Sequence, residues 1–411
     1  MNTTEQKTAG AEEGKEIEIL KVMETNKLQP LSEYFDQYYT TLKDGAEIEG
    51  LYSGFPILDN NLRGLRQTIV LAGSPKTGKT SFCTQLITQI AEFNGSKIYP
   101  AIPLKNKGNN EYPNIEVKQK QAVLFYSLEM SKSDITTKLI SQLSGVDYWK
   151  IRLNRNLIQT EETLKEAEKK RAGMVNVFIR DLNDYPGKDD ATTLNFLKVK
   201  AEIAQVKSLT GRAEIIVFID HLNVFPIDKK EYKDQIEKEG ELIKQFNRIA
   251  LEEGVTMLLI SQTNKEAMRE TAGLFDNLQE AENRANYDAF LSGVKGSVDT
   301  VYIASGIWSM VKTGREFYSN SPKKEEINGR TVLMERPPIY VKLLALAVTE
   351  RNSPGGVFFL LYLPFMQRFE IMPYSKIVDY CKDNLNMTDK EINEEFLTKK
   401  EKKDTNNKGA K

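Results

Sequence analysis

Cysteine and histidine are nearly absent from this sequence, which has two cysteines and one histidine in 411 residues. Cys83, Cys381 and His221 are too few for a Cys/His metal site or a framework of disulfides. Long apolar runs are also missing, because stretches such as residues 357–363 fall far short of the ~20 residues that a membrane-spanning helix needs. The sequence therefore excludes a membrane protein, and any catalysis must use carboxylates, Lys, Arg and hydroxyl groups.

A targeting segment and a broad charge of one sign are lacking as well. The first residues, MNTTEQKTAGAEEGKE, contain no apolar core and no Arg-rich amphipathic stretch, so we expect a cytoplasmic location. The 57 Lys and Arg residues balance 58 Asp and Glu residues, which gives a net charge of -1. A nucleic-acid partner would therefore have to bind at a local basic patch.

The segment before residue 49 divides into two parts. Residues 1–30 are polar without hydrophobic periodicity, and we expect a flexible arm there. From Leu31 to Leu42 apolar side chains recur at helical spacing, and Asp44-Gly45 ends the pattern. Residues 31–48 are therefore expected to hold a helix with one apolar face, which could pack on the chain's own core or on a neighbouring subunit.

Short β-rich apolar runs alternate with helical stretches from residue 67 onward. These runs are QTIVLAG, AVLFYSLE, VNVFIRDL, EIIVFIDHL and VTMLLISQT. Strands that are apolar on both faces and separated by helices indicate an α/β fold with a mostly parallel central sheet covered by helices. The later runs TVYIAS, YVKLLALAVTE and GVFFLLYLP lie close together and indicate an antiparallel C-terminal extension.

These patterns predict one α/β domain at residues 49–374. Two stretches inside it, about residues 94–120 and 306–338, are polar and rich in Gly, Asn, Pro and Lys, and we expect surface insertions there. Residues 375–411 form a charged tail, which is expected to be partly disordered after one helix.

One motif lies between the first apolar run and the helix that follows it. Residues 73–80, GSPKTGKT, match GxxxxGK[ST], a P-loop pattern in which backbone N–H groups at a helix start surround phosphate groups. Lys79 would reach the β- and γ-phosphates, and Thr80 would bind Mg²⁺. The predicted phosphate-binding residues are Gly73, Ser74, Pro75, Lys76, Thr77, Gly78, Lys79 and Thr80. The sequence therefore predicts a nucleoside triphosphate site.

Polar side chains at the ends of three later runs are candidates for the chemistry. Asp220 ends the run EIIVFID and would bind Mg²⁺, although an Asp there could also cap a turn. Glu129 ends AVLFYSLE, which we expect beside the P-loop strand; it could activate the attacking water or belong to a helix cap region. Gln262 follows TMLLIS and could sense the γ-phosphate or be an ordinary strand-end residue.

Taken in order, these segments resemble the C-terminal ATPase domain of DnaB-type replicative helicases, which belong to the RecA-like superfamily. The resemblance extends roughly from Tyr52 to Glu370. The segments that carry it are SGFPILDNNLRGL, VLFYSLEMSKSDITTKLISQLSGVDYWKIR, IIVFIDHLNVF, LLISQTNK and ERNSPGGVFFLLYLPFMQRFE. Their collinear order is more specific than any single motif.

The resemblance implies roles for particular residues. Lys79 and Thr80 would bind the phosphates of ATP and Mg²⁺, Asp220 would be the Walker B acid, Glu129 the catalytic glutamate and Gln262 the sensor. Arg351 would be an arginine finger that acts in trans, so hydrolysis would require an assembled ring. The helix in residues 31–48 would be the family's linker helix, which docks on the adjacent subunit.

The chain departs from the family pattern in three places. Thr349 stands where the family usually has a lysine two residues before the finger arginine, and slower hydrolysis is the expected consequence. The loop FLSGVKGSVDTV resembles the DNA-contacting region, with Lys295 as its only cation; Lys295 could bind DNA or be an ordinary solvated lysine. The family's helical N-terminal domain has no counterpart before residue 49, which weighs against primase docking through such a domain.

Three functions are compatible with these observations. The first is an ATP-dependent, ring-forming replicative DNA helicase that translocates on single-stranded DNA and unwinds duplex DNA. Its expected partners are single-stranded DNA, further copies of itself in a homo-oligomer, expected to be a hexamer, and a primase or helicase loader. The second is a RecA-like ATPase that coats single strands for recombination or annealing, and the third is a nucleotide-gated scaffold with little hydrolysis. The complete, ordered set of motifs favours the first.

Overall fold

The chain forms two compact units, Met1–Glu47 and Ile48–Lys411. The predicted arm at residues 1–30 and helix at residues 31–48 lie outside the described residues, except for Leu31. Within the described ranges, no helix is both long and apolar enough to cross a membrane. Besides Leu31, Lys165, Lys169 and Tyr232, the computed structural model describes residues 50–62, 64–92, 96–99, 115–118, 121–153, 172–187, 193–227, 235–262, 303–319, 323–327, 330–334, 339–350, 356–372 and 374–383.

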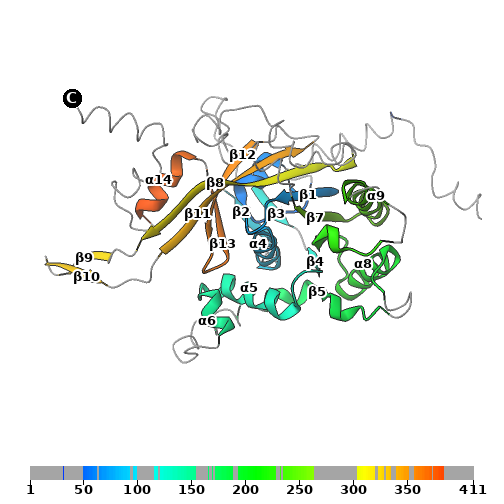
Figure 1. The fold of residues 1–411 in the computed structure, drawn as a ribbon, viewed down its shortest axis with the longest axis horizontal. Coiled ribbons are helices and arrows are strands. Elements are labelled where there is room, and N and C mark those ends of the chain that lie inside the picture. The colour runs from blue at the N-terminus through cyan, green and yellow to red at the C-terminus, as the bar shows by residue number, and fades with distance from the viewer. Residues whose placement is uncertain are drawn as a thin grey trace, which may run out of the picture. The chain divides into compact units, whose positions relative to one another are not determined.

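A nine-stranded mixed sheet, counted over the described residues, forms the centre of the second unit (Figure 1). Its parallel part contains, in spatial order, β5 (Val177–Asp181), β4 (Ala122–Ser127), β6 (Ile215–Asp220), β7 (Thr256–Gln262), β1 (Thr68–Gly73) and β8 (Gly306–Ser319). The sheet continues with the antiparallel strands β11 (Ile339–Glu350), β12 (Gly356–Leu363) and β13 (Arg368–Met372). The predicted α/β fold with a mostly parallel sheet and an antiparallel C-terminal extension is therefore confirmed.

Helices cover both faces of this sheet because the strands carry apolar side chains on both faces. Ile69 and Leu71 of β1 pack in one hydrophobic cluster with α3, α4 and α5, whereas Val70 and Ala72 pack in a second cluster with α8 and α9. The helices are α3 (Pro56–Leu62), α4 (Lys79–Glu92), α5 (Lys132–Ser144), α6 (Tyr148–Arg152), α8 (Phe196–Thr210), α9 (Gln235–Glu253) and α14 (Tyr374–Asp383). Short 3₁₀ turns are η1 (Ala172–Asn176), η2 (Leu182–Asp184) and η3 (Leu222–Val224).

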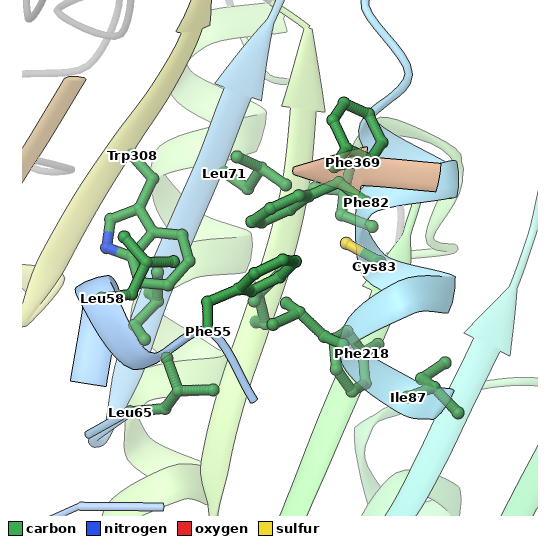
Figure 2. Close-up of a cluster of buried hydrophobic side chains, with 14 of the residues drawn as sticks. Phe55, Leu58, Leu65, Leu71, Phe82, Cys83, Ile87, Phe218, Trp308 and Phe369 are labelled. Carbon is green, nitrogen blue, oxygen red and sulfur yellow. The ribbon is translucent and has the colours of Figure 1, made fainter. Parts of the chain in front are cut away.

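The first cluster includes Phe82, which lies on α4 two residues after the P-loop (Figure 2). Its ring stacks on Phe55 at 5.4 Å between centroids and meets Phe369 of β13 edge-on at 5.5 Å. Trp308 of β8, which is fully buried, approaches Phe82 from the other side. Residues from both ends of the domain thus fix the helix that begins at the P-loop.

The predicted insertion at residues 306–338 is wrong at its start. Gly306–Met310 belong to β8 and pair in parallel with Ile69–Gly73 of β1, in the middle of the sheet. The prediction of a strand at TVYIAS is also wrong for its last residues, which the structure describes. Ile303 is helical and Ser305 forms a bend. The hydroxyl and the backbone N–H of Ser305 donate to the carbonyl oxygen of Thr68, so this residue ends a turn before the strand begins.

Two small antiparallel pairs lie outside the main sheet. β2 (Ser96–Tyr99) pairs with β3 (Ile115–Lys118) inside the predicted insertion at residues 94–120, and β9 (Lys323–Ile327) pairs with β10 (Arg330–Met334). The predicted tail, in contrast, begins with a packed element. Ile377 and Cys381 of α14 are buried in a third cluster, against β11 and β12. The packed part of the second unit therefore extends to Asp383.

A buried carboxyl group lies at the start of the second unit and gives a testable pH effect. Asp59 of α3 accepts a hydrogen bond from the backbone N–H of Ser53 at 2.9 Å, and burial raises the pKa of its carboxyl group to about 7. The pKa of this group is ~3.9 in an unfolded chain, so the folded chain binds the proton more tightly. The resulting stabilisation is complete below about pH 4 and is lost as the pH rises to about 7.

Asp59→Asn removes this ionisation and keeps an oxygen for the Ser53 N–H. The free energy of unfolding of both proteins is measured with urea from pH 5 to pH 8. We expect the variant to gain a few kcal/mol relative to wild type as the pH rises across that range. Wild type is measured alongside at each pH. Parallel pH profiles for the two proteins would show that Asp59 is already ionised at pH 5 in the folded chain.

Candidate nucleotide site

The P-loop joins the carboxyl end of β1 to the start of α4, and both of its glycines are sterically required. A Cβ on Gly73 would lie 2.7 Å from the carbonyl oxygen of Met310. Gly78 has φ +89°, and a Cβ there would lie 2.9 Å from the ring of Phe369. Thr77, which is buried, donates its hydroxyl to the carbonyl oxygen of Ser74 at 2.9 Å and closes the loop. Pro75 and Lys76 are exposed at its tip.

Lys79 is the first residue of α4, and its side chain turns back over the loop. Its Nζ donates to the carbonyl oxygens of Gly73 at 2.7 Å and Ser74 at 3.1 Å. Burial lowers the pKa of Lys79, while the negative charges of Asp220 and Glu129 act in the opposite direction. The ammonium group thus lies against the backbone carbonyls of the P-loop, with both acids close enough to affect its pKa.

Asp220 ends β6 and is almost completely buried. Burial, with a smaller contribution from the charge of Glu129, raises the pKa of its carboxyl group to about 6. The Thr80 hydroxyl acts in the opposite direction and lowers the pKa of Asp220, whose buried Oδ2 has no hydrogen-bond partner among the described residues. A buried carboxylate with one free oxygen beside a threonine hydroxyl is the donor set that Mg²⁺ prefers, so these residues fit a magnesium ion.

Glu129 follows β4 and its side chain is exposed. The expectation that β4 lies beside the P-loop strand is wrong, because β7 and β6 separate it from β1. The carboxyl ends of parallel strands nevertheless meet at one edge of the sheet, and the charge of Glu129 acts on both Lys79 and Asp220. Among the described residues, no hydrogen bond or ion pair is formed by its carboxylate.

The remaining predicted site residues differ in how they are placed. Gln262 is the exposed last residue of β7, and in the register of the sheet it pairs with Gly73 at the start of the P-loop. Thr349 lies near the end of β11, opposite Ile307 of β8. Arg351 and Lys295 lie outside the described residues, so the finger and the DNA-contacting loop stay predictions.

Two lysines near the site were missed by the sequence analysis. The charge of Lys312, on β8 two residues beyond the partner of Gly73, lowers the pKa of Lys79. Lys138 of α5 is buried, which lowers its pKa to about 8, and its Nζ donates to Gln367 Oε1 at 2.5 Å and to Ser81 Oγ at 3.1 Å. Ser81 directly follows Thr80, so Lys138 joins the P-loop helix to the turn between β12 and β13. No local sequence signal marks either lysine.

The described residues thus bring together a glycine-containing loop at a helix start, an ammonium group, a hydroxyl and carboxylate pair, and an exposed carboxylate. Their charges are complementary to a phosphate chain with a divalent cation. An exposed carboxylate at the same edge can orient or deprotonate water. The arrangement is suited to binding a nucleoside triphosphate and hydrolysing its terminal phosphate.

A sequence model of the DnaB-like helicase C terminal domain matches residues 50–275, more than half of the chain. The replicative DNA helicase DnaB of Rickettsia bellii is 25% identical over 239 residues, which is 57% of this chain and 42% of that protein. A probable replicative DNA helicase of Trieres chinensis is 26% identical over 222 residues, 53% of this chain and 40% of that protein. The chain therefore aligns with less than half the length of these curated relatives.

Solved structures show the same fold. One solved ATPase domain superposes with a TM-score of 0.58 at 17% identity, over 84% of this chain and 100% of that one. A DnaB-like replicative helicase, whose structure was described together with its interactions with primase, superposes with a TM-score of 0.56 at 17% identity, over 86% of this chain and 70% of that one.

Proposed function

The chain belongs to the DnaB-like helicase C-terminal domain family, and from that membership we propose that it is an ATP-driven, ring-forming motor that translocates on single-stranded DNA and unwinds duplex DNA. The observation that carries the proposal is the meeting of Lys79, Thr80, Asp220 and Glu129 at one edge of the parallel sheet. A protein that only binds ATP would need Lys79, Thr80 and Asp220. Hydrolysis also needs a group that acts on water, and the exposed carboxylate of Glu129 can supply it.

Lys79 is proposed to bind the β- and γ-phosphates. In the described structure its ammonium group is held by two carbonyl oxygens of the P-loop, so it is already aimed at the space that the loop encloses. Residues 73–80 would bind the remaining phosphate oxygens through backbone N–H groups at the start of α4. Lys312 adds a second positive charge on the neighbouring strand.

Thr80 and Asp220 are proposed to hold Mg²⁺. The ion, when bound, neutralises negative charge on the phosphate oxygens. The Thr80 hydroxyl lies close enough to Asp220 to lower its pKa, and Asp220 Oδ2 is buried without a hydrogen-bond partner among the described residues, so it is free to bind a cation.

Glu129 is proposed to orient the attacking water and accept its proton, because its carboxylate is exposed at the same edge and is not engaged with the described residues. Gln262, paired with the first glycine of the P-loop, would sense the γ-phosphate from β7. Arg351 of one subunit would complete the site of the next, so full activity would need a ring. A primase or loader is a further proposed partner, at a surface that the described residues do not identify.

Steady-state ATP hydrolysis by the full chain, with and without single-stranded DNA, tests this function. We expect hydrolysis to rise several-fold with DNA, a ring in ATP by native mass measurement, and unwinding of a forked duplex. Hydrolysis on DNA with filaments in place of rings would instead support the single-strand-coating ATPase. Tight ATP binding without turnover would contradict a motor and favour the scaffold.

A further inference from the structure

The turn that carries Glu129 lies between two strand-end aspartates. Ser127, the last residue of β4, pairs with Asp220 of β6 on one side and with Asp181 of β5 on the other. Glu129 follows two residues later, and α5 begins at Lys132. The three strand ends are adjacent, so each aspartate can reach the turn between β4 and α5.

On the side of β6, the turn is held by the backbone. The N–H of Leu128 donates to the carbonyl oxygen of Asp220 at 2.5 Å. Within the turn, the hydroxyl of Ser127 donates to the carbonyl oxygen of Met130 at 2.6 Å. These bonds fix the residues on both sides of Glu129 and leave its side chain exposed.

On the side of β5, the turn is held by a carboxylate. The backbone N–H of Lys132 donates to Asp181 Oδ2 at 2.8 Å. The first N–H groups of a helix have no partner within the helix, and a bond to an ionised carboxylate is stronger than one to a neutral acceptor. Asp181 is itself buried, so the start of α5 is tied to a charged group with little access to water.

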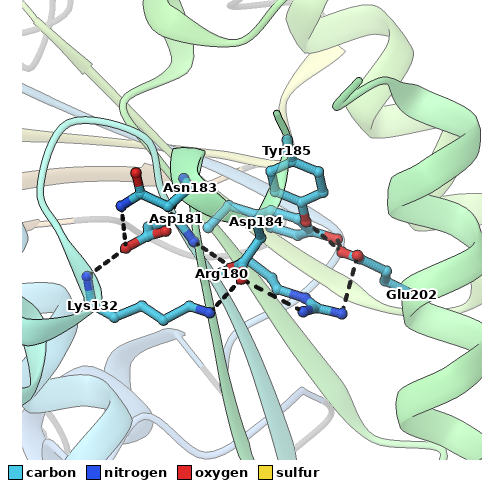
Figure 3. A network of polar contacts seen from close by, with 8 residues as sticks. Lys132, Arg180, Asp181, Asn183, Asp184, Tyr185 and Glu202 are labelled. Atoms are coloured by element: carbon cyan, nitrogen blue, oxygen red, sulfur yellow. Dashed lines mark hydrogen bonds and ion pairs between the residues drawn. The ribbon is translucent and has the colours of Figure 1, made fainter. Parts of the chain in front are cut away.

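Asp181 is in turn fixed by its own surroundings (Figure 3). Its carboxylate accepts from the N–H of Asn183 at 3.0 Å, while Asp184 accepts from the N–H of Asp181 at 3.0 Å, a reciprocal cap on η2. Asp184 pairs with the ammonium of Lys132 at 2.5 Å. The start of α5 is therefore joined to this cap by two separate links, from the backbone of Lys132 to Asp181 and from its side chain to Asp184.

This cap is anchored to the far side of the sheet through Glu202 of α8 (Figure 3). Glu202 is buried and accepts hydrogen bonds from the hydroxyls of Tyr126 and Tyr185, both at 2.7 Å. Arg180, next to Asp181, pairs with Glu202 at 3.3 Å. The support behind Asp181 thus has little freedom to move.

We propose that Asp181 is a positioning residue for ATP hydrolysis, whose carboxylate holds the start of α5 and thereby the turn that presents Glu129. The inference rests on the proposed hydrolytic role of Glu129. Asp181 acts through Glu129 and does not contact the nucleotide. Asp181 contacts the first residue of α5, whereas Lys138, which joins α5 to the P-loop helix, lies further along α5. We therefore expect loss of Asp181 to lower turnover more than nucleotide binding.

The test compares wild type, Asp181→Ala, Glu129→Gln and the double variant in steady-state ATPase assays with the full chain. We expect Asp181→Ala to lower kcat ~10- to 100-fold, as a small displacement of a catalytic group does, with KM for ATP unchanged within about threefold. In the Glu129→Gln background, the same substitution should cause no further loss, because the group that it positions is already disabled. Glu252→Gln, at an exposed ion pair on α9, is the matched control and should behave as wild type.

The outcomes separate the two proposals. If wild type hydrolyses ATP and Glu129→Gln lowers kcat, but Asp181→Ala does not, only the positioning role is refuted. A full additional loss in the double variant would also refute it, since the effect would then be independent of Glu129. If Glu129→Gln has no effect, the proposed catalytic role itself fails. Should Asp181→Ala not fold, the isosteric Asp181→Asn is put through the same comparison, judged by thermal unfolding and by kcat.

Discussion

Replacing Lys79 with alanine is expected to reduce ATP hydrolysis by ~10³-fold or more, because it removes a positive charge from the place where phosphate charge develops. Lys79 donates two hydrogen bonds to P-loop carbonyls, and the loop encloses its ammonium group. Neither Lys138, which is engaged with Ser81 and Gln367, nor Lys312, which is exposed on the next strand, can take its place.

The same substitution should not unfold the protein. A buried ammonium group costs free energy to desolvate, and its loss removes that cost together with two hydrogen bonds. We therefore expect the melting temperature of Lys79→Ala to match or exceed that of wild type, while binding of a fluorescent ATP analogue weakens. Lys200→Ala, which breaks an exposed ion pair with Glu252, is the control for charge removal. Retained hydrolysis in Lys79→Ala would exclude residues 73–80 as the site of turnover.

Glu129→Gln is expected to lower kcat by ~10² to 10⁴-fold while ATP still binds, because it removes a general base and keeps the shape of the side chain. No hydrogen bond to the Glu129 carboxylate occurs among the described residues, so the fold should be unaffected. Binding is measured by calorimetry and turnover by phosphate release. Loss of the nearby negative charge also lowers the pKa of Asp220, which favours the ionised carboxylate that a cation needs.

Glu214→Gln is a matched control for this substitution. Glu214 is exposed, directly precedes β6, and therefore lies at the opposite edge of the sheet from the P-loop. We expect its kcat to equal that of wild type. Equal kcat values for Glu129→Gln and Glu214→Gln would mean that Glu129 is only part of the turn before α5.

The sequence predicts the parts of the site that depend on contiguous residues. The P-loop is a local pattern of glycines, a lysine and a threonine, and Asp220 follows an uninterrupted apolar strand, so both are recognisable without tertiary information. Glu129 and Gln262 could be placed at the same edge because parallel strands share it. Gln262 ends β7, whereas β4 ends at Ser127, two residues before Glu129, and is not a neighbour of β1.

Features that depend on pairing between distant residues were not predictable. Trp308 lies in the short apolar run GIWSM, followed by a long polar stretch, so composition indicated an insertion where burial between β1 and β11 makes a strand. Lys132 and Asp181 are 49 residues apart, and Ser81 and Gln367 are 286 apart. Neither pair produces a periodic pattern in the sequence. The residues of each pair meet only because the order of strands in the sheet brings them together.

The position of β8 beside β1 also bears on how this protein can be divided. The strand that ends at the P-loop has β7 as one neighbour and β8 as the other, and the second comes from the C-terminal half of the chain. A fragment that ended after β7 would contain every residue proposed to bind phosphate and would still leave β1 as a bare sheet edge, with Phe82 deprived of Trp308 and Phe369. The shortest fragment suitable for expression or crystallisation therefore extends through α14, well beyond β7, the last strand with a residue of the proposed site.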